Sequence, residues 1–213
     1  MSLKSIGTPR ERCSACGSSL TLCMCAVLPR LAVRTKVVLV IHRHELLRSS
    51  NTGRLAVRAL VNSDLRIRGE SRAMLDLSDL LSSCYRSLLY YPSSDAVELT
   101  SELVAVDPRP IQLIVPDGTW RQARKIHSRH PELKGVLRVK ISTPNDSTYQ
   151  LRAQSRPEGM ATLLAVAVAL GIIEGEAVAL QLMQLYQARV ARTLGARGLL
   201  PRDSLWNGTS FPR

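Results

Sequence analysis

The stretch IQLIVPDGTW, residues 111–120, decides the fold class that we predict. Its first part, 111–115, is an almost continuous apolar run of the kind that forms a strand buried on both faces of a parallel sheet. Pro116 has no backbone N–H, so we expect it to stop the sheet pairing. Asp117 would then stand at the end of the strand, where a loop can hold a carboxylate near a ligand.

The three residues that follow allow both a functional and a structural interpretation. Gly118 permits unusual backbone angles or a close approach to a ligand. Thr119 can cap the helix that we expect over 118–129, and Trp120 offers a flat face for a base or for core packing. In the structural alternative, Asp117 is only a helix cap and Trp120 belongs to the core.

Strands alternate with helices along the rest of the chain. Further strands are predicted at 36–41, 87–91 and 136–139. Helices are predicted from 51–53 onward, with apolar Leu55, Leu60 and Val61, and over 160–171 and 175–193. We expect a loop with a short helix at 93–104 and a loop at 142–158. This alternation predicts an α/β domain with a mainly parallel sheet flanked by helices. In such sheets ligands bind beyond the carboxyl ends of the strands.

Length and composition fit one domain with a small appendage. The chain has 213 residues and 45% hydrophobic content, enough for a real core. We predict a Cys-rich segment at 1–30, the main domain at 31–194 and a tail at 195–213. The longest apolar segment, 161–173, is shorter than the roughly 18 residues that a membrane span needs. With no signal peptide visible, we expect a soluble, cytoplasmic protein.

The chain is strongly basic, with 29 Lys and Arg against 17 acidic residues and a formal net charge of +12. Such an excess favours a polyanion, either nucleic acid or an acidic membrane surface, although a generally basic protein without a special partner would have the same composition. Arg121, Arg124 and Lys125 would share one side of a helix. They would form a phosphate-gripping face beside Asp117, though a solvated helix face would look similar.

A second polar group follows the strand predicted at 36–41. Its members are His42, Glu45, Arg48, Asn51 and Thr52. The last two can cap the next helix, whose N-terminus would offer N–H groups to an anion or a carboxylate. We interpret the group as part of a site, whereas a lone histidine is more often structural, and nothing else singles out His44.

Four of the five cysteines lie close together in the N-terminal segment, at Cys13, Cys16, Cys23 and Cys25. Close Cys pairs supply the thiolate ligands that zinc prefers, and a metal would provide folding energy that so short and polar a segment lacks. We predict a structural zinc site. Disulfides, an iron–sulfur cluster and uncommitted thiols are the alternatives, and Cys84 is interpreted as a buried apolar side chain.

Together these residues resemble the DTW-domain family. The resemblance rests on D-G-T-W after an apolar strand, a Cys-rich N-terminus, H-x-x-E at a strand end and N-T-G-R-L opening the next helix, and it runs from Cys13 to about residue 169. The characterised members of the family are tRNA-uridine aminocarboxypropyltransferases. The resemblance implies a fold related to the SPOUT RNA-modifying enzymes with a C-terminal trefoil knot, which no sequence pattern alone would predict.

The resemblance also implies the reaction and its partners. S-adenosylmethionine would give its 3-amino-3-carboxypropyl group to N3 of a uridine in tRNA (acp3U formation), in the variable loop for the bacterial type, and methylthioadenosine would leave. A SPOUT-like RNA methyltransferase, an aminocarboxypropyltransferase acting on ribosomal RNA, and a zinc-stabilised RNA-binding protein without catalysis remain the alternatives. We expect no membrane partner, and the sequence leaves open whether the protein is a monomer or a homodimer.

The family motifs are carried over residue by residue. The implied catalytic residues are Asp117, as general base or orienting group, with Thr119 and Trp120. The implied S-adenosylmethionine site comprises Val115, Pro116, Gly118, Leu151, Arg152 and Thr162. The implied RNA site comprises His42, Glu45, Arg48, Asn51, Thr52, Arg121, Arg124 and Lys125. The chain departs from the family at Leu164, where a Glu is usual. A role for a carboxylate at that point is therefore in doubt.

Overall fold

A computed structural model of the chain describes residues 11–46, 48–70, 74–142 and 160–199. Six strands, all parallel, form one sheet in the order β2-β1-β5-β3-β6-β4. The strands are β1 (Lys36–His42), β2 (Ser63–Arg68), β3 (Arg86–Tyr90), β4 (Val97–Glu98), β5 (Ile111–Asp117) and β6 (Leu137–Lys140). The predicted parallel α/β sheet is confirmed.

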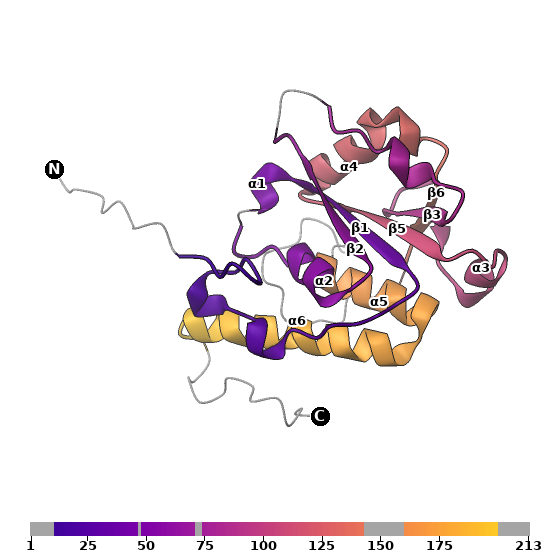
Figure 1. Cartoon of the computed structure of the whole chain (residues 1–213). Coiled ribbons are helices and arrows are strands. Elements are labelled where there is room, and N and C mark those ends of the chain that lie inside the picture. The colour runs from indigo at the N-terminus through magenta and orange to yellow at the C-terminus, as the bar shows by residue number, and fades with distance from the viewer. Residues whose placement is uncertain (1–10, 47, 71–73, 143–159, 200–213) are drawn as a thin grey trace.

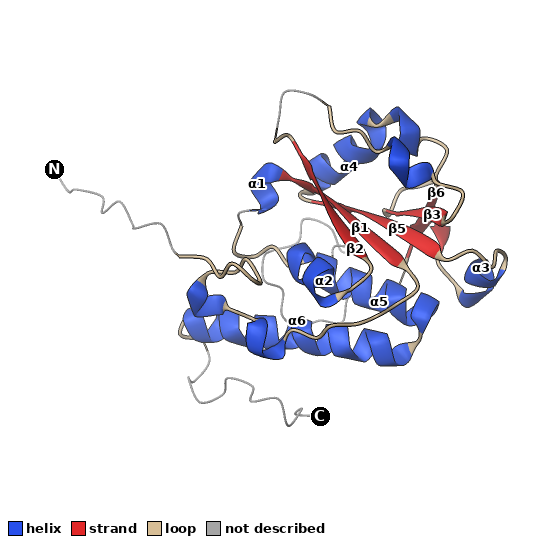
Figure 2. Ribbon diagram, in the orientation of Figure 1, coloured by secondary structure: helices blue, strands red, loops and turns tan. Residues whose placement is uncertain are grey.

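Helices cover both faces of this sheet (Figures 1 and 2). The α-helices are α1 (Arg43–Leu46), α2 (Gly53–Ala59), α3 (Ser101–Ala105), α4 (Trp120–Arg129), α5 (Thr162–Glu174) and α6 (Glu176–Ala196), and short 3-10 turns lie at η1 (Leu20–Leu22), η2 (Cys25–Val27), η3 (Ser78–Leu81) and η4 (Pro131–Leu133). Helices α2, α5 and α6 lie on one face of the sheet and α4 on the other. No helix in these described ranges is long and apolar enough to span a membrane.

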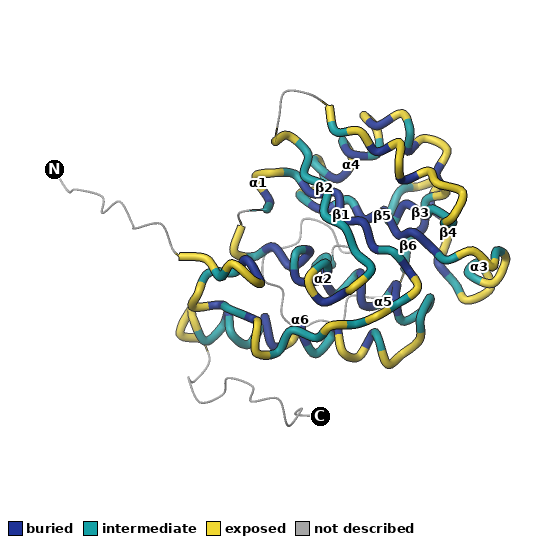
Figure 3. The backbone as a smooth tube through the Cα atoms, viewed as in Figure 1, coloured by how far each residue is buried: buried dark blue, intermediate teal, exposed yellow. Residues whose placement is uncertain are grey.

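Alternation along the central strands divides the core between the two faces. On β5, Leu113 and Val115 join the cluster formed with α2, α5 and α6, whereas Ile114 joins the cluster formed with α4. Strands β1 and β5 are buried almost throughout, as Figure 3 shows. Cys16 and Met24 belong to the first cluster, so the Cys-rich segment packs into the core of the main domain.

The structure corrects one expectation about the central strand. Pro116 does not stop the pairing: it lies opposite Val40 of β1, and Asp117 lies opposite Ile41. Pairing of β5 with β3 has ended at Ile114, so the proline occupies a position with a strand on one side only. A proline without an N–H is tolerated at such a half-paired position. Asp117 still stands at the carboxyl end of the strand.

Other boundaries also differ. Neither edge strand was predicted. In β2, Leu65 and Ile67 alternate with charged residues and give only a short apolar signal, and β4 is two residues long within the loop expected at 93–104. Helix α2 ends before Leu60 and Val61, which were expected to continue it. Cys84 is exposed rather than buried. Helix α6 continues two residues into the tail expected at 195–213. The path that would decide the predicted knot includes residues 143–159, outside the described ranges, so the knot stays a prediction.

Candidate active site

The site is organised around the carboxylate of Asp117. This side chain is 4% exposed. Its Oδ2 accepts a hydrogen bond of 2.6 Å from Nδ2 of Asn51, and its Oδ1 accepts one of 2.6 Å from Oγ1 of Thr162. One residue from each of three motifs, far apart in sequence, therefore meets at the carboxyl end of β5.

The start of α2 is built to receive this carboxylate. A Cβ atom on Gly53, the first residue of α2, would lie 2.7 Å from Oδ2 of Asp117 and 2.9 Å from Cδ2 of Leu39. Only a glycine leaves room for this approach. Asn51 also uses its Oδ1 to accept a hydrogen bond of 3.2 Å from the backbone N–H of Arg54, so one side chain caps the helix and holds the aspartate.

Helix α5 is tied to the same point by two hydroxyl groups. Thr162, its first residue, donates to Asp117, and the backbone N–H of Leu163 donates to Oγ1 of Thr52 over 3.2 Å. Of the two predicted caps of α2, Asn51 makes the capping bond, whereas the side chain of Thr52 makes none there and accepts from α5 instead. Leu164, where the family usually has Glu, packs against the apolar core.

Residues Gly118 and Thr119 shape the turn into α4. Thr119 is the N-cap: its Oγ1 accepts from the N–H of Gln122, and Oε1 of Gln122 accepts from the N–H of Thr119 over 2.8 Å. Gly118 has a φ of 150°, and a Cβ there would lie 2.9 Å from Oε1 of Gln122. The glycine is thus required by this reciprocal cap, and the predicted capping role of Thr119 is confirmed.

Trp120 and Asp117 face opposite sides of the sheet. Trp120 meets the ring of Tyr91 edge-on with ring centroids 6.2 Å apart, and both belong to the cluster under α4. Asp117 follows the alternation of Leu113 and Val115 and faces α2 and α5. The structure therefore does not bring Trp120 to the carboxylate. Val115 is itself a core residue, whereas Leu151 and Arg152 lie outside the described ranges.

The polar residues after β1 form a separate group beside the site. His42 stacks on His44 with ring centroids 5.2 Å apart. Burial, together with the positive charges of nearby groups including Arg68 and Arg43, lowers the pKa of His42. Glu45 is fully buried, and its Oε1 lies 3.0 Å from Nε of the half-exposed Arg48. These residues share an edge of the sheet with Asp117.

A basic surface runs along α4 and includes the end of β2. The charges of Arg121 and Arg129, and then partial burial and Arg68, lower the pKa of Lys125. Arg129 in turn acts on Arg68, whose pKa is lowered mainly by burial. We define Arg68, Arg121, Lys125 and Arg129 as the basic surface. Sequence spacing could have included Arg129, four residues after Lys125, but Arg68 belongs to the strand that was not predicted.

The four N-terminal cysteines come together as a compact group. All four Sγ atoms lie within 4.8 Å of one another, with Cys13 and Cys25 3.4 Å apart and Cys16 and Cys23 3.8 Å apart. A tetrahedral zinc–thiolate site with Zn–S bonds of about 2.3 Å has sulfur atoms about 3.8 Å apart. The backbone N–H of Met24 also points to Sγ of Cys16 at 3.5 Å. The donor set and its spacing fit a zinc ion.

Taken together, these features define an α/β protein with a polar ligand site at the carboxyl edge of a parallel sheet and a four-cysteine segment packed against it. A family model described as DTW domain matches residues 10–194, and the chain belongs to this family. The resemblance seen in the sequence motifs is thereby confirmed.

Relatives of known name share most of the chain. The tRNA-uridine aminocarboxypropyltransferase 2 of Drosophila melanogaster is 31% identical over 172 residues, which cover 78% of this chain and 67% of the fly protein. The protein of the same name from Macaca fascicularis is 28% identical over 170 residues, covering 78% of this chain but only 57% of its own. The chain thus spans little more than half of the macaque protein.

Two further comparisons extend the range of organisms. The tRNA-uridine aminocarboxypropyltransferase A of Arabidopsis thaliana is 27% identical over 194 residues, with 78% of this chain and 73% of the plant protein covered. Among solved structures, the SAM-dependent rRNA:acp-transferase Tsr3 from Vulcanisaeta distributa aligns with a TM-score of 0.47 and 18% identity, covering 80% of this chain and 79% of its own.

Proposed function

We propose that this protein transfers the 3-amino-3-carboxypropyl group from S-adenosylmethionine to N3 of a uridine in tRNA, in the variable loop. The observation that carries the proposal is the meeting of Asn51, Asp117 and Thr162, one residue from each family motif, at the carboxyl end of β5. Family membership and the names of the relatives support the same reaction.

The reaction sets two physical demands. The bond between sulfur and the γ-carbon of the methionine moiety breaks, a bond between that carbon and N3 forms, the N3 proton is released, and methylthioadenosine leaves as a neutral thioether. The γ-carbon, rather than the methyl group, must therefore face the uracil. Holding two reactants in such an arrangement can supply roughly 7–11 kcal/mol in favourable cases. A site held by hydrogen bonds between three segments is suited to positioning.

In this proposal Asp117 is a positioning residue and the counter-charge of the donor. Both of its oxygens accept hydrogen bonds and it is almost fully buried, which favours the orienting role over removal of the N3 proton. Its negative charge would attract the sulfonium of S-adenosylmethionine. The donor would lie against the turn at 116–118 and the start of α5 at Thr162, with Leu151 and Arg152 completing its site.

The test of this function is a nucleoside analysis. The protein is incubated with unmodified tRNA and S-adenosylmethionine labelled in the aminobutyrate part, and the digested tRNA is examined by mass spectrometry. We expect labelled acp3U and stoichiometric methylthioadenosine. S-adenosylhomocysteine as the by-product would identify a methyltransferase instead. In a parallel incubation with ribosomal RNA, label in that RNA but not in tRNA would show that the acceptor is ribosomal RNA. RNA binding without any new nucleoside would identify a binding protein without catalysis.

The basic surface is expected to hold the tRNA backbone. Replacing Arg121 and Lys125 by Gln should weaken tRNA binding and reduce the slope of log K against log salt concentration by about 1–2, because each phosphate that the protein no longer neutralises keeps about one counterion that binding would have released. Fluorescence anisotropy with labelled tRNA at several salt concentrations measures both quantities. Arg30→Gln/Arg34→Gln, two exposed charges just before β1, is the matched control. If the two double variants show the same slope of log K against log salt concentration, the tRNA does not bind at the basic surface.

The four-cysteine group is expected to hold one structural zinc ion, through Cys13, Cys16, Cys23 and Cys25. Cys16→Ser should remove the ion and lower the free energy of unfolding by about 3 kcal/mol or more, since metal binding to such sites supplies folding energy. For a domain of this size this is a fall in Tm of roughly 6–12 °C. Metal analysis and thermal melts measure the two effects. Cys84→Ser changes an exposed thiol outside the group and should alter neither; equal metal content in both variants would contradict the site.

A further inference from the structure

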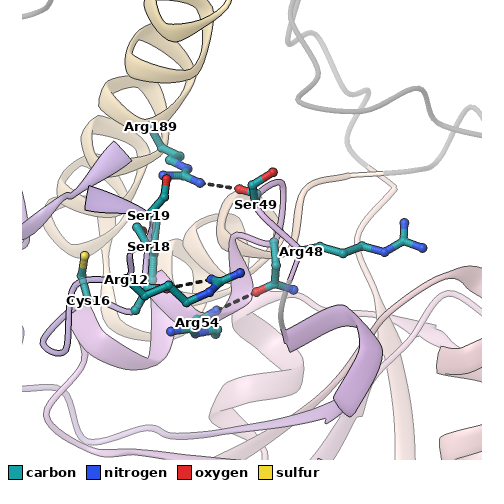
Figure 4. Close-up of a pocket in the computed structure, with 11 residues that line it drawn as sticks. Arg12, Cys16, Ser18, Ser19, Arg48, Ser49, Arg54 and Arg189 are labelled. Carbon is teal, nitrogen blue, oxygen red and sulfur yellow. Dashed lines mark hydrogen bonds between the residues drawn. The ribbon is translucent and has the colours of Figure 1, made fainter. Parts of the chain in front are cut away.

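A small pocket opens between the Cys-rich segment, the loop before α2, and α6 (Figure 4). Its polar lining includes Arg12, Ser18, Ser49, Asn51, Arg54 and Arg189. None of the residues that line it, all within the described part of the chain, is Asp or Glu. We call this the arginine pocket. It is distinct from the basic surface, which lies over α4 and β2.

Three arginines from distant parts of the sequence supply its charge. Arg12 comes from the Cys-rich segment, Arg54 from α2 and Arg189 from α6, and Figure 4 shows them grouped around the pocket. Arg48 also lines it, but its side chain extends away from the other three and its Nε pairs with Glu45. The three grouped charges repel one another, so an anion placed among them would be strongly favoured.

Arg189 gives the strongest indication that the pocket can bind an anion. Its side chain is 2% exposed, and its guanidinium donates to the backbone carbonyls of Leu22 and Ser49. Its Nε is buried without a hydrogen-bond partner, and no carboxylate in the described ranges forms an ion pair with it. A buried cation that lacks an anionic partner is costly, so the site gains when an anion arrives.

Backbone carbonyls hold the other two guanidinium groups in place. Nη1 of Arg12 donates to the carbonyl of Gly17 over 3.1 Å, and Nη1 of Arg54 donates to the carbonyl of Leu46 over 2.9 Å. The guanidinium of Arg54 lies directly over Gly17, where a Cβ would be 1.2 Å from its Nη2. Fixed donors of this kind lose little entropy when they bind an oxyanion.

The chemistry of the grouped side chains indicates which anion they would bind. A guanidinium group presents its N–H donors in one plane, and this arrangement matches two oxygens of a phosphate or phosphodiester. The pocket lining includes three such groups, on Arg12, Arg54 and Arg189.

The arginine pocket is connected to the candidate active site through Asn51. This residue lines the pocket, and its Nδ2 donates to Asp117. We propose that the arginine pocket binds one backbone phosphate of the acceptor RNA, next to the nucleotide that enters the active site; this rests on the proposed function. The Cys-rich segment would then contact the RNA through Arg12 in addition to packing against the core.

The test compares RNA binding by charge variants of the full chain. Arg12→Gln and Arg54→Gln, singly and together, are measured by anisotropy with an unmodified tRNA transcript at several salt concentrations. We expect the double variant to bind about tenfold more weakly or worse, with a salt slope lower by about 1. Arg34→Gln, an exposed arginine just before β1, should leave both values unchanged.

Three controls keep the outcomes distinct. Thermal melts and zinc content of each variant show whether the Cys-rich segment is intact; Arg54→Lys, which keeps the charge, is the second variant if Arg54→Gln unfolds. The affinity for S-adenosylmethionine should be the same in all variants. If a variant binds S-adenosylmethionine more weakly but RNA as well as the wild type, the pocket binds the carboxylate of the donor, and the proposal is overturned. Equal RNA affinity and slope in wild type and double variant would also overturn it. Failure of the wild type to bind tRNA at all would instead defeat the proposed function.

Discussion

Asp117→Asn is expected to lower kcat/KM for S-adenosylmethionine by at least about 100-fold, mainly through weaker binding of the donor. The variant keeps the shape of the side chain. Its Oδ1 can still accept from Asn51, and its Nδ2 can donate to the hydroxyl of Thr162, which rotates to accept. These two hydrogen bonds can persist while the negative charge is lost, and a unit charge pair about 4 Å apart near a protein surface is worth about 4 kcal/mol. Steady-state kinetics and direct measurement of S-adenosylmethionine affinity give the result.

Asparagine is a sharper choice than alanine at this position. Alanine would leave the buried donors of Asn51 and Thr162 without an acceptor, at about 1–3 kcal/mol each, so lost activity could reflect lost folding. Asp76→Asn makes the same chemical change at an exposed aspartate and serves as the control. Near-wild-type kcat/KM would remove Asp117 from the mechanism, and a loss confined to kcat would assign it the removal of the N3 proton instead.

The main strands could be predicted because their signal is local. Strands β1, β3 and β5 contain short apolar runs bounded by polar or turn residues, and the sequence places them to within one or two residues. Strand β6 is placed equally well, because three of the four residues at 136–139 are apolar. Strand β2 was missed because an edge strand buries little and therefore carries charge at alternate positions. Pro116 was misinterpreted because a proline signals the end of pairing without showing that one neighbouring strand has already ended.

The candidate site was predicted in parts but not as an arrangement. Asn51, Asp117 and Thr162 were all named from motifs, yet hydrogen bonds across 66 and 45 residues cannot be inferred from one sequence. The same limit applies to Trp120, because its packing against Tyr91 under α4 joins residues distant in sequence. The arginine pocket was missed entirely because its three arginines share no motif, only a place in the fold.

Gly53→Ala is expected to lower the transfer rate by about 100-fold and to destabilise the protein by about 1–3 kcal/mol. Helix propensity alone predicts the opposite, since Ala is favoured over Gly within a helix by about 1 kcal/mol. The structure reverses the sign: the new methyl group would lie 2.7 Å from Oδ2 of Asp117 and 2.9 Å from Cδ2 of Leu39, both in a packed interior. The carboxylate must move, and a displacement of about 1 Å at a reacting centre can cost about 100-fold in rate.

The matched control for this variant is Gly135→Ala. A Cβ at Gly135 would meet nothing within 4 Å, and the residue is exposed just before β6. We expect this change to be neutral or slightly stabilising, because it reduces the freedom of the unfolded chain by up to about 1 kcal/mol. Thermal melts and single-turnover rates of both variants separate the two mechanisms. A Gly53→Ala variant that is as active and as stable as Gly135→Ala would contradict this prediction. The position of the Asp117 carboxylate against the start of α2 would then not matter for activity, and its hydrogen bonds to Asn51 and Thr162 would not be what aligns the donor with the uridine.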